Sequence, residues 1–528
     1  MFLLIISLFL NILGIQSGLP QNGSADQVVD TVLKMAERTS LDPDDFLYPS
    51  FHIYTMAAIL SPYFLYSVAT YGSETILKDT SIRLAIVSNS IWVGRIVSAI
   101  YGMFLIGAIY FLALNIFDKK TALLSAIFAT FTMGFVNLAH FATPDIPMMF
   151  WCTLSLIFCV KIYKKANTKS YVLAGVFAGI ATGIKYYAIF LFIPIIIAHL
   201  MNYIGHTIEI KRAFNKKISL SLLLIPIIFL ITTPFSIINH PRFLEHISKL
   251  FNTRSSSSWG IDPNAWLTHI FNLDNAMGTP LFIVAILGSC YALYYAAANI
   301  KRDKANWILF SWVLMFILML VSWKIAPMRN IMPIVPVLLI FGAKFLTDLA
   351  ANKRLKTIMI IIIFLIVAYS AIYAIYTDTL FINDSRHLAA EWVNENIPTS
   401  EKIQTFSVDV YVPRLPHHNV NRINFEHISS EEELLENIKN YGPDYIITSS
   451  LYYDRFLNYY MDYPRRALPF ANALKEPASA LPFADSFYKK LFDNKLNYRI
   501  IKTFPEKRLK VPAPEFVNPY IEIWQKVT

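Results

Sequence analysis

Long apolar runs broken by short charged segments fill the first 378 residues of the chain. A helix needs about 20 mostly apolar residues to cross a bilayer. Runs of this kind lie at 84–114, 121–139, 146–163, 218–238, 279–298, 307–323, 331–347 and 357–377. A shorter run, 2–17, has no basic start and no small-residue cleavage site, so it is interpreted as a first span rather than a signal peptide. The pattern predicts a mostly α, polytopic transmembrane bundle.

Five short segments between the apolar runs concentrate Lys and Arg. They are centred on Lys119–Lys120, on 161–169, on 211–217, on 301–304 and on 353–356. Cytoplasmic loops collect such residues, so all five should share one side of the membrane. That holds only if the apolar stretch 171–200 crosses twice, folding back near Gly183-Ile184-Lys185. This interpretation predicts about 11 spans, with the N-terminus inside and the C-terminus outside.

Two large segments then fall on the outer face, 18–83 and 239–278. The first is acidic at its start, whereas its later part, Tyr54 to Tyr71, is apolar and aromatic. If this part crossed the membrane, the five basic segments could no longer all lie on one side. We therefore expect Tyr54–Tyr71 to be a helix that lies at the interface or docks on the bundle.

The last 150 residues change character, because apolar runs shorten and charges return. Ser385 to Asn396 has helical spacing and is closed by Pro398. Short apolar stretches follow, separated by polar segments, at Lys402–Phe406, Tyr445–Thr448, Tyr498–Phe504 and Ile521–Trp524. The alternation predicts a small extracytoplasmic α/β domain at 379–528, after a membrane domain at 1–378 that includes the outer loop 18–83.

Composition agrees with a membrane protein, since 55% of residues are apolar, 16% are charged and the mean hydropathy is +0.46. These values exclude disorder and a water-soluble enzyme. The net charge of +10 comes from residues 1–378, which hold 28 basic and 17 acidic side chains. Because these bases sit in short loops between spans, we predict no nucleic-acid partner. All three cysteines lie inside apolar runs, so no disulfide framework is predicted.

Ionisable residues at membrane depth or at span ends are candidates for function. Lys185 sits at the predicted bend, and Arg329 opens the tenth span on the same outer side. Each has a structural alternative, a snorkelling lysine and an interfacial anchor. Two cations converging on one rim would bind a phosphate.

Several acidic and imidazole side chains share that side. Asp145 begins the fourth span, and Asp26 opens an amphipathic stretch in which Asp30 follows one turn later. Helix capping is the structural alternative for both Asp26 and Asp145. His140 ends the third span and His52 follows a turn; a hydrogen-bonded structural role is the commoner one for such histidines.

Walker A, HExxH, G-x-S-x-G and CxxC motifs are absent. Nucleotide hydrolysis, a zinc peptidase and a lipase of those types therefore have no support. Outward-facing carboxylates and cations on a helical bundle leave two classes. One is a transferase with a lipid-borne phosphate donor, and the other is a transporter or flippase of a polyprenyl-linked substrate. No internal repeat of the kind many transporters have is visible.

The motifs resemble the GT-C superfamily of integral-membrane glycosyltransferases, in particular bacterial relatives of protein mannosyltransferases and aminoarabinose transferases. The resemblance covers nearly the full length. It is carried by Gly18-Leu19-Pro20 leading to Asp26, Leu47 to Tyr54, Phe141 to Pro147, Ala174 to Tyr186, Arg329 to Pro336, and Asp384 to Pro398. It implies inverting transfer of a sugar from a polyprenyl-phosphate carrier to a hydroxyl of a lipid, glycan or protein acceptor, in a bacterial cytoplasmic membrane.

The resemblance also implies residue roles. Asp26 would activate or orient the acceptor, and Asp145 would help position that site or a cation. Lys185, Arg329 and Tyr186 would bind the lipid phosphate. The family usually has Asp-Glu where this chain has Asp26-Gln27. Gln27 cannot ionise, so this departure weakens the case for a divalent cation as cofactor at Asp26 and Asp145. It also keeps a third reading, a non-catalytic partner subunit.

Overall fold

The structure is a computed structural model that describes most of the chain. The described residues are 1–19, 26–202, 215–255, 265–298, 304–323, 327–406, 411–453, 482–505 and 517–527. Lys211, Arg212, Lys301, Arg302 and most of a serine run at 255–258 lie outside these residues.

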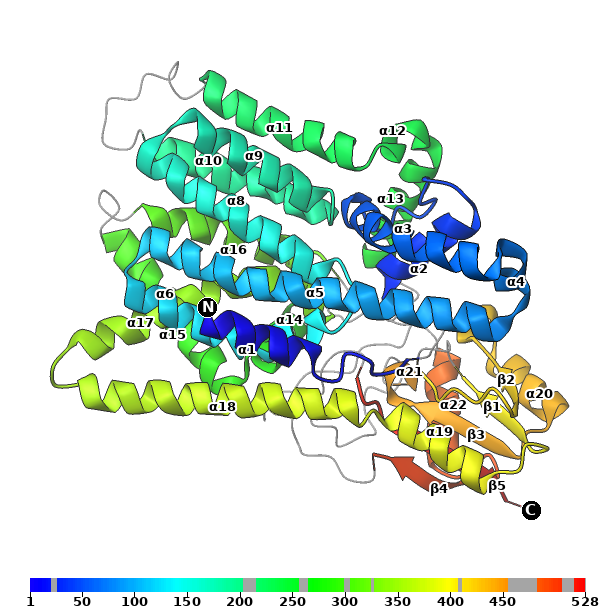
Figure 1. Cartoon of the computed structure of the whole chain (residues 1–528). Helices are drawn as coiled ribbons and strands as arrows, with labels where there is room; N and C mark the ends of the chain where they lie inside the picture. Colours follow the sequence, from blue (N-terminus) through cyan, green and yellow to red (C-terminus); the bar gives the residue numbers. More distant parts are fainter. Residues whose placement is uncertain are drawn as a thin grey trace.

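The first two-thirds of the chain form a bundle of roughly aligned helices (Figure 1). Its elements are α1 (Phe2–Ile12), α5 (Thr80–Ile116), α6 (Lys119–Thr130), α7 (Met133–Ala139), α8 (Asp145–Lys165), α9 (Thr168–Thr182), η1 (Tyr186–Leu191), α10 (Phe192–Met201), α11 (Lys216–Thr232), α15 (Thr279–Ala298), α16 (Ala305–Val321), η3 (Met328–Asn330), η4 (Met332–Ile334), α17 (Val335–Ala351) and α18 (Lys356–Ile382). Every apolar run of the sequence is therefore helical.

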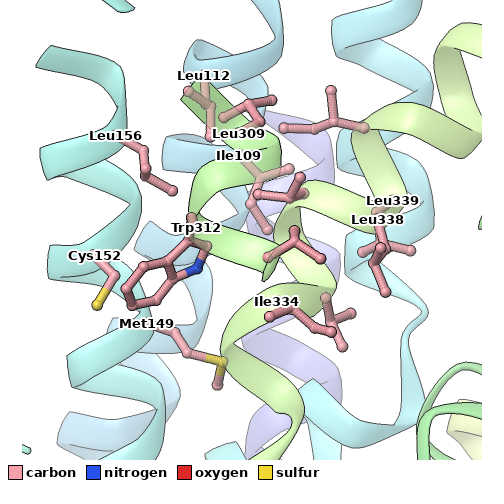
Figure 2. Close-up of a cluster of buried hydrophobic side chains, with 14 of the residues drawn as sticks. Ile109, Leu112, Met149, Cys152, Leu156, Leu309, Trp312, Ile334, Leu338 and Leu339 are labelled. Atoms are coloured by element: carbon pink, nitrogen blue, oxygen red, sulfur yellow. The ribbon is translucent and has the colours of Figure 1, made fainter. Parts of the chain in front are cut away.

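Apolar side chains from distant parts of the chain form the core of the bundle. Figure 2 shows Ile109 of α5, Met149 and Cys152 of α8, Trp312 of α16 and Leu338 of α17 meeting there. The indole of Trp312 donates to the carbonyl oxygen of Pro333 at 3.0 Å. Its one polar atom is thus satisfied inside an otherwise apolar core.

The basic segments gather at one end of the bundle, as the loop charges predicted (Figure 1). Lys217 Nζ donates to Ala166 O at 2.9 Å, and Lys304 Nζ donates to Met201 O at 3.0 Å. The first bond joins the start of α11 to the residue after α8, and the second joins the start of α16 to the end of α10.

Six helices of the described residues are long and apolar enough to cross a membrane, and the bent pair α6–α7, with an angle of 56°, makes a seventh. Three further apolar helices are shorter: Phe2–Ile12, Tyr186–Met201 and Ala305–Val321. The chain is a multi-pass membrane protein, as predicted. By length and composition the six include α3 (Phe51–Tyr71), for which we expected an interfacial position.

A second group of helices covers the opposite end of the bundle, where the C-terminal domain also lies (Figure 1). It comprises α2 (Gln27–Glu37), α3, α4 (Ser73–Lys78), α12 (Phe235–Ile238), α13 (His240–Ser255) and α14 (Ala265–Met277). His52 of α3 contacts Tyr101 of α5, and Tyr63 accepts a hydrogen bond from Asn89. At these two contacts the residue number increases along α3 and decreases along α5. The two helices are therefore antiparallel, with α3 beside the first half of α5.

Close helix packing at α9 gives a stability prediction. A Cβ on Gly175 would lie 2.3 Å from the backbone oxygen of Ser221 in α11, whereas one on Gly107 would meet only Leu4, at 3.9 Å. Gly175→Ala should therefore cost about 1–3 kcal/mol of stability by overpacking, and Gly107→Ala should cost little. Thermal unfolding in detergent measures both; equal midpoints would contradict this packing.

The C-terminal domain is a five-stranded mixed sheet in the order β2-β1-β3-β5-β4. The strands are β1 (Lys402–Thr405), β2 (Asn419–Arg422), β3 (Tyr445–Ser449), β4 (Tyr498–Phe504) and β5 (Ile521–Lys526). β1 pairs in parallel with β2 and β3, and β5 pairs antiparallel with β3 and β4. The four apolar stretches of the sequence are strands; β2, whose sequence is polar, was missed.

Three helices pack on this sheet: α19 (Ser385–Asn396), α20 (Glu431–Tyr441) and α22 (Pro482–Phe492). Alternate residues of β3 point to opposite faces. Ile446 joins one core with Leu434 and Phe487, and Ile447 joins another with Ala389 and Val393. The predicted α/β character and the helix at 385–396 are confirmed.

Candidate functional site

The amphipathic helix α2 brings Asp26 onto the bundle. Its apolar face, Val28, Val29, Val32 and Met35, is buried against α3 and α5. The contact with α5 is close, since a Cβ on Gly94 would lie 2.6 Å from Val29. Asp26 directly precedes α2, but its side chain makes no capping bond.

Asp26 instead forms a buried ion pair with Arg95 of α5. Arg95 Nη2 lies 2.7 Å from Oδ2, its Nε lies 3.1 Å from Oδ1, and the Ala142 amide donates to Oδ1 at 2.6 Å. Arg95 Nη1 also donates to the carbonyl oxygens of Ile15 and Ser17. The pair thus ties the first outer segment to α5 and to the turn before α8.

Asp145 and Lys185 form the second buried ion pair of this region. Lys185 Nζ donates to Asp145 Oδ1, and the buried Asp145 Oδ2 has no hydrogen-bond partner in the described part of the chain. Lys185 Nζ also lies 5.6 Å from the centre of the Tyr48 ring and 5.4 Å from that of Tyr187. An ammonium between two aromatic faces is stabilised by cation–π attraction.

The turn that carries Lys185 lies where the sequence placed it, between the end of α9 and the start of η1. Gly183 is required there because a Cβ would lie 2.4 Å from Thr232 Oγ1 of α11. The Gly183 carbonyl accepts a hydrogen bond from the Phe51 amide at 2.9 Å. The turn therefore packs against the first residue of α3.

Arg329 and Tyr186 were the other predicted phosphate ligands. Arg329 lies in η3 and is half-buried, close enough for its charge to act on Lys185. The Tyr186 hydroxyl donates to the Phe46 carbonyl oxygen at 2.7 Å. In this conformation Tyr186 therefore anchors the loop before α3.

Both ion pairs lie about one bilayer thickness from the basic end of the bundle. Arg95 is 21 residues from Ile116, the last residue of α5, and Asp145 is 20 residues from Lys165, the last residue of α8. At 1.5 Å per residue both distances are about 30 Å, which matches the hydrocarbon thickness. The residues of α5 before Arg95 extend beyond this level, beside α2, α3 and α4 (Figure 1).

The two candidate histidines are buried and differ in their contacts. His140 lies 2.7 Å from the Val136 carbonyl oxygen and 2.6 Å from that of Leu13, and it stacks on Phe381. It holds the segment after α1 against α7 and α18, which is a structural role. Neither ring nitrogen of His52 has a hydrogen-bond partner among the described residues.

Asp30 lies one turn beyond Asp26 on α2. Burial, and then the charge of Asp26, raises its pKa to about 6. The folded chain therefore binds the Asp30 proton more tightly than the unfolded chain. Stability contributed by this group is present below pH 3.8 and is lost as the pH rises to about 6.

Asp30→Asn should accordingly raise the midpoint of thermal unfolding by a few degrees at neutral pH and leave it unchanged below pH 3.8. The exposed Glu74→Gln, a partner of Lys78 in an i,i+4 pair, is the matched control and should show no such dependence. If Asp30→Asn raised the midpoint of thermal unfolding equally at neutral pH and below pH 3.8, burial of a charged Asp30 would be contradicted.

The described cavities do not reach the two ion pairs. Neither of the two cavities described among the placed residues is lined by Asp26, Asp145 or Lys185. No group of three or more His, Cys, Asp or Glu side chains in the described ranges is arranged to hold a metal. At Asp26 the fit to a divalent cation is poor, because Arg95 and the Ala142 amide occupy its oxygens.

Arg95 is the main residue that sequence reasoning missed. It lies inside the apolar run 84–114, so an ionisable residue at membrane depth was the signal. Tyr48 was also missed as a contact of Lys185, and nothing in its local sequence indicates that role.

Comparison with known proteins bears on the fold. Residues 80–238 match the family described as dolichyl-phosphate-mannose-protein mannosyltransferase. No curated protein matches the sequence. The structure is similar to that of ArnT from Cupriavidus metallidurans bound to undecaprenyl phosphate, with a TM-score of 0.51 and 12% identity over 99% of this chain and 97% of that one.

An Archaeoglobus fulgidus oligosaccharyltransferase, in complex with zinc and sulfate, is similar at a TM-score of 0.50 and 14% identity, over 99% of this chain and 88% of that one. Both matches extend over the bundle and the C-terminal domain. The chain therefore shares the fold of these two proteins, and residues 80–238 match the mannosyltransferase family, in agreement with the GT-C resemblance of the sequence motifs.

Proposed function

We propose that the chain transfers a sugar from a polyprenyl-phosphate donor to an acceptor hydroxyl at the outer face of the membrane, with inversion at the anomeric carbon. The observation that carries the proposal is the Asp145–Lys185 pair, buried one bilayer thickness from the basic end and within reach of the charge of Arg329. Lys185 and Arg329 bind the lipid phosphate, whose negative charge grows as the glycosidic bond breaks. The undecaprenyl phosphate bound to ArnT supports this class of donor.

In this proposal Asp145 positions the phosphate site, because it is already the counter-ion of Lys185. Asp26 orients the acceptor hydroxyl or accepts its proton, after Arg95 yields one carboxylate oxygen. Asp30 and His52 flank this region, and membrane lipids surround the bundle. The acceptor is a lipid, a glycan or a protein.

The proposed topology has eleven crossings, with the basic end cytoplasmic and α3 at the outer interface. Residues 1–378 form the membrane domain, and 379–528 form an extracytoplasmic domain in the bacterial cytoplasmic membrane. The antiparallel packing of α3 on the protruding half of α5 supports the interfacial position. The amide of Gly18 donates to His387 of α19 at 3.1 Å, a contact that supports an outer C-terminal domain.

Sugar transfer by purified protein in liposomes tests the proposal, with a polyprenyl-phosphate-linked radioactive sugar and extracted envelope material as acceptor. Asp26→Asn and Lys185→Ala should each lower the rate at least a hundredfold, a loss of about 2.7 kcal/mol of transition-state stabilisation. Glu74→Gln, far from both pairs, should retain the wild-type rate. Undiminished transfer in both site variants would contradict the assignment.

One observation favours a second candidate, a non-catalytic partner subunit. Both oxygens of Asp26 are engaged by Arg95 and by the Ala142 amide, as expected of a purely structural carboxylate. Absence of transfer by the wild type with every acceptor fraction, together with retained binding of polyprenyl phosphate, would favour this reading.

A further inference from the structure

A polar cavity on the outer end of the bundle lies apart from both ion pairs. Its volume is about 440 Å³, within the usual range of ligand sites. Three elements line it: the last turn of α2, the loop before α3, and α13 (Figure 1). The lining residues are Lys34, Glu37, Arg38, Pro43, Asp44, Asp45, Leu47, Arg242, His246 and Lys249.

Buried contacts hold the walls of this cavity in place. Phe46 is buried against Phe243 of α13, with ring centres 5.6 Å apart, and its amide donates to His246 Nδ1 at 3.0 Å. Asn239 donates to Asp42 at 2.8 Å. Phe46 lies between the lining residues Asp45 and Leu47, and its carbonyl accepts the hydroxyl of Tyr186, the residue after Lys185. The cavity is thus a built feature adjoining the phosphate region.

Two guanidinium groups converge on one carboxylate inside the cavity. Arg38 Nη1 lies 3.2 Å and Arg242 Nε lies 3.5 Å from the oxygens of Asp44. Arg242 Nη1 donates to Glu245 at 2.9 Å, whereas Nε makes no hydrogen bond to any residue that the structure describes. The Arg242 side chain is 40% exposed, so a ligand anion can reach this guanidinium from solvent and replace Asp44.

The remaining charges favour an incoming anion. Lys34 and Lys249 add two exposed ammonium groups to the rim. Of the other carboxylates, Glu37 is paired with Arg83 and Asp45 lies 3.4 Å from His246. Guanidinium groups bind carboxylate and phosphate oxygens with strong, directional hydrogen bonds.

The helix α2 connects this cavity to the proposed reaction site. Asp26 directly precedes its first residue and Glu37, its last, lines the cavity. Eleven helical residues correspond to about 16 Å. Asp26, Asp30 and Lys34 are spaced four residues apart, so they lie along one stripe of this helix.

We propose that the cavity binds an anionic group, a carboxylate or phosphate, carried by an extended glycan acceptor. The acceptor lies along the polar stripe of α2, with its anion between Arg242, Arg38 and Lys34 and its reacting hydroxyl near Asp26. This inference rests on the proposed function for the identity of the acceptor, whereas the anion site itself is independent of catalysis.

The test is equilibrium binding of tetragalacturonate, an acidic oligosaccharide, to the full chain in phosphatidylcholine nanodiscs. The wild type should bind it and should not bind neutral maltotetraose. The double variant Lys34→Gln/Arg242→Gln should bind at least about tenfold more weakly, and Lys78→Gln, outside the cavity, should match the wild type. Arg38 is left intact because it also donates to the carbonyl oxygens of Asp42 and Pro43.

Asp44→Asn should change the affinity for tetragalacturonate in the opposite direction. It removes the internal carboxylate that competes with the ligand, so tetragalacturonate should bind more tightly, a result that a merely structural residue would not give. The proposed site would be overturned if all variants bound tetragalacturonate with equal affinity, or if the wild type bound maltotetraose as tightly as tetragalacturonate. Loss of binding in nanodiscs that contain phosphatidylglycerol would identify a lipid headgroup as the occupant and overturn the acceptor.

Sugar transfer from the polyprenyl-phosphate donor is measured separately on the same variants. If the anion site is correct and the proposed function is wrong, tetragalacturonate binding follows the pattern above without transfer. If the proposed function is correct and the anion site is wrong, transfer proceeds while all variants bind the probe alike.

Discussion

Asp145→Asn should bind polyprenyl phosphate about tenfold more tightly than the wild type, or better, while losing sugar transfer. In the described conformation Asp145 is the counter-ion of Lys185, so an incoming phosphate must displace it. Oppositely charged side chains in direct contact have coupling energies of about 1.5 kcal/mol or more. Asparagine removes that competition and leaves Lys185 uncompensated until the phosphate arrives.

Binding of polyprenyl phosphate to detergent-solubilised protein measures this effect. Asp348→Asn is the matched control, since Asp348 pairs with Lys344 at 2.7 Å and lies near the basic end of the bundle. It should leave the affinity unchanged, and Lys185→Ala should weaken it at least tenfold. An unchanged affinity in Asp145→Asn would show that the phosphate does not compete for Lys185.

Arg95→Met should destabilise the chain by about 3–5 kcal/mol, because it leaves the buried carboxylate of Asp26 without its cation. The double variant Arg95→Met/Asp26→Asn should recover much of this loss, since it removes both charges together. Unfolding in increasing SDS, measured for the two single variants and the double variant, gives the coupling energy of the pair.

Arg83→Met is the control on the same helix. Arg83 pairs with Glu37 at 2.6 Å, but both side chains are exposed, and such pairs contribute less than about 1 kcal/mol. Additive losses from Arg95→Met and Asp26→Asn would contradict a coupled buried pair. They would also remove the reason for assigning Arg95 the task of positioning Asp26.

Hydropathy and loop charge predicted the architecture because both record the solvent that each segment meets. The fold-back at Gly183 followed from the requirement that Lys164 and Lys217 share a side, and Lys217 does bond to Ala166 next to that loop. The strand β2 was not predicted because its sequence, Asn419 to Arg422, is polar and its side chains are half-buried or exposed.

Single residues of the site could be selected from the sequence, but their pairing could not. The resemblance assigned Asp26 and Lys185 to one site, and the structure pairs them with Arg95 and Asp145 respectively. Pairing depends on how α2, α5 and α8 approach one another in space, and apolar periodicity does not encode that. Arg95 could have been selected as a charge inside an apolar run; its partner 69 positions away could not.

The two ion pairs suggest one account of how the site works. Asp26 and Asp145 are each held by a buried cation, so in the proposed reaction substrate binding has to exchange one anion for another. Lys185 is the residue at which this exchange is most direct, because Arg329 adds positive charge and no described residue bonds to Asp145 Oδ2.

A structure of the full chain with polyprenyl phosphate bound tests the central claim most directly. The account predicts the phosphate oxygens within hydrogen-bond distance of Lys185 Nζ and the Arg329 guanidinium, with Asp145 moved away from Lys185. A phosphate bound elsewhere, with the Asp145–Lys185 pair intact, would contradict it.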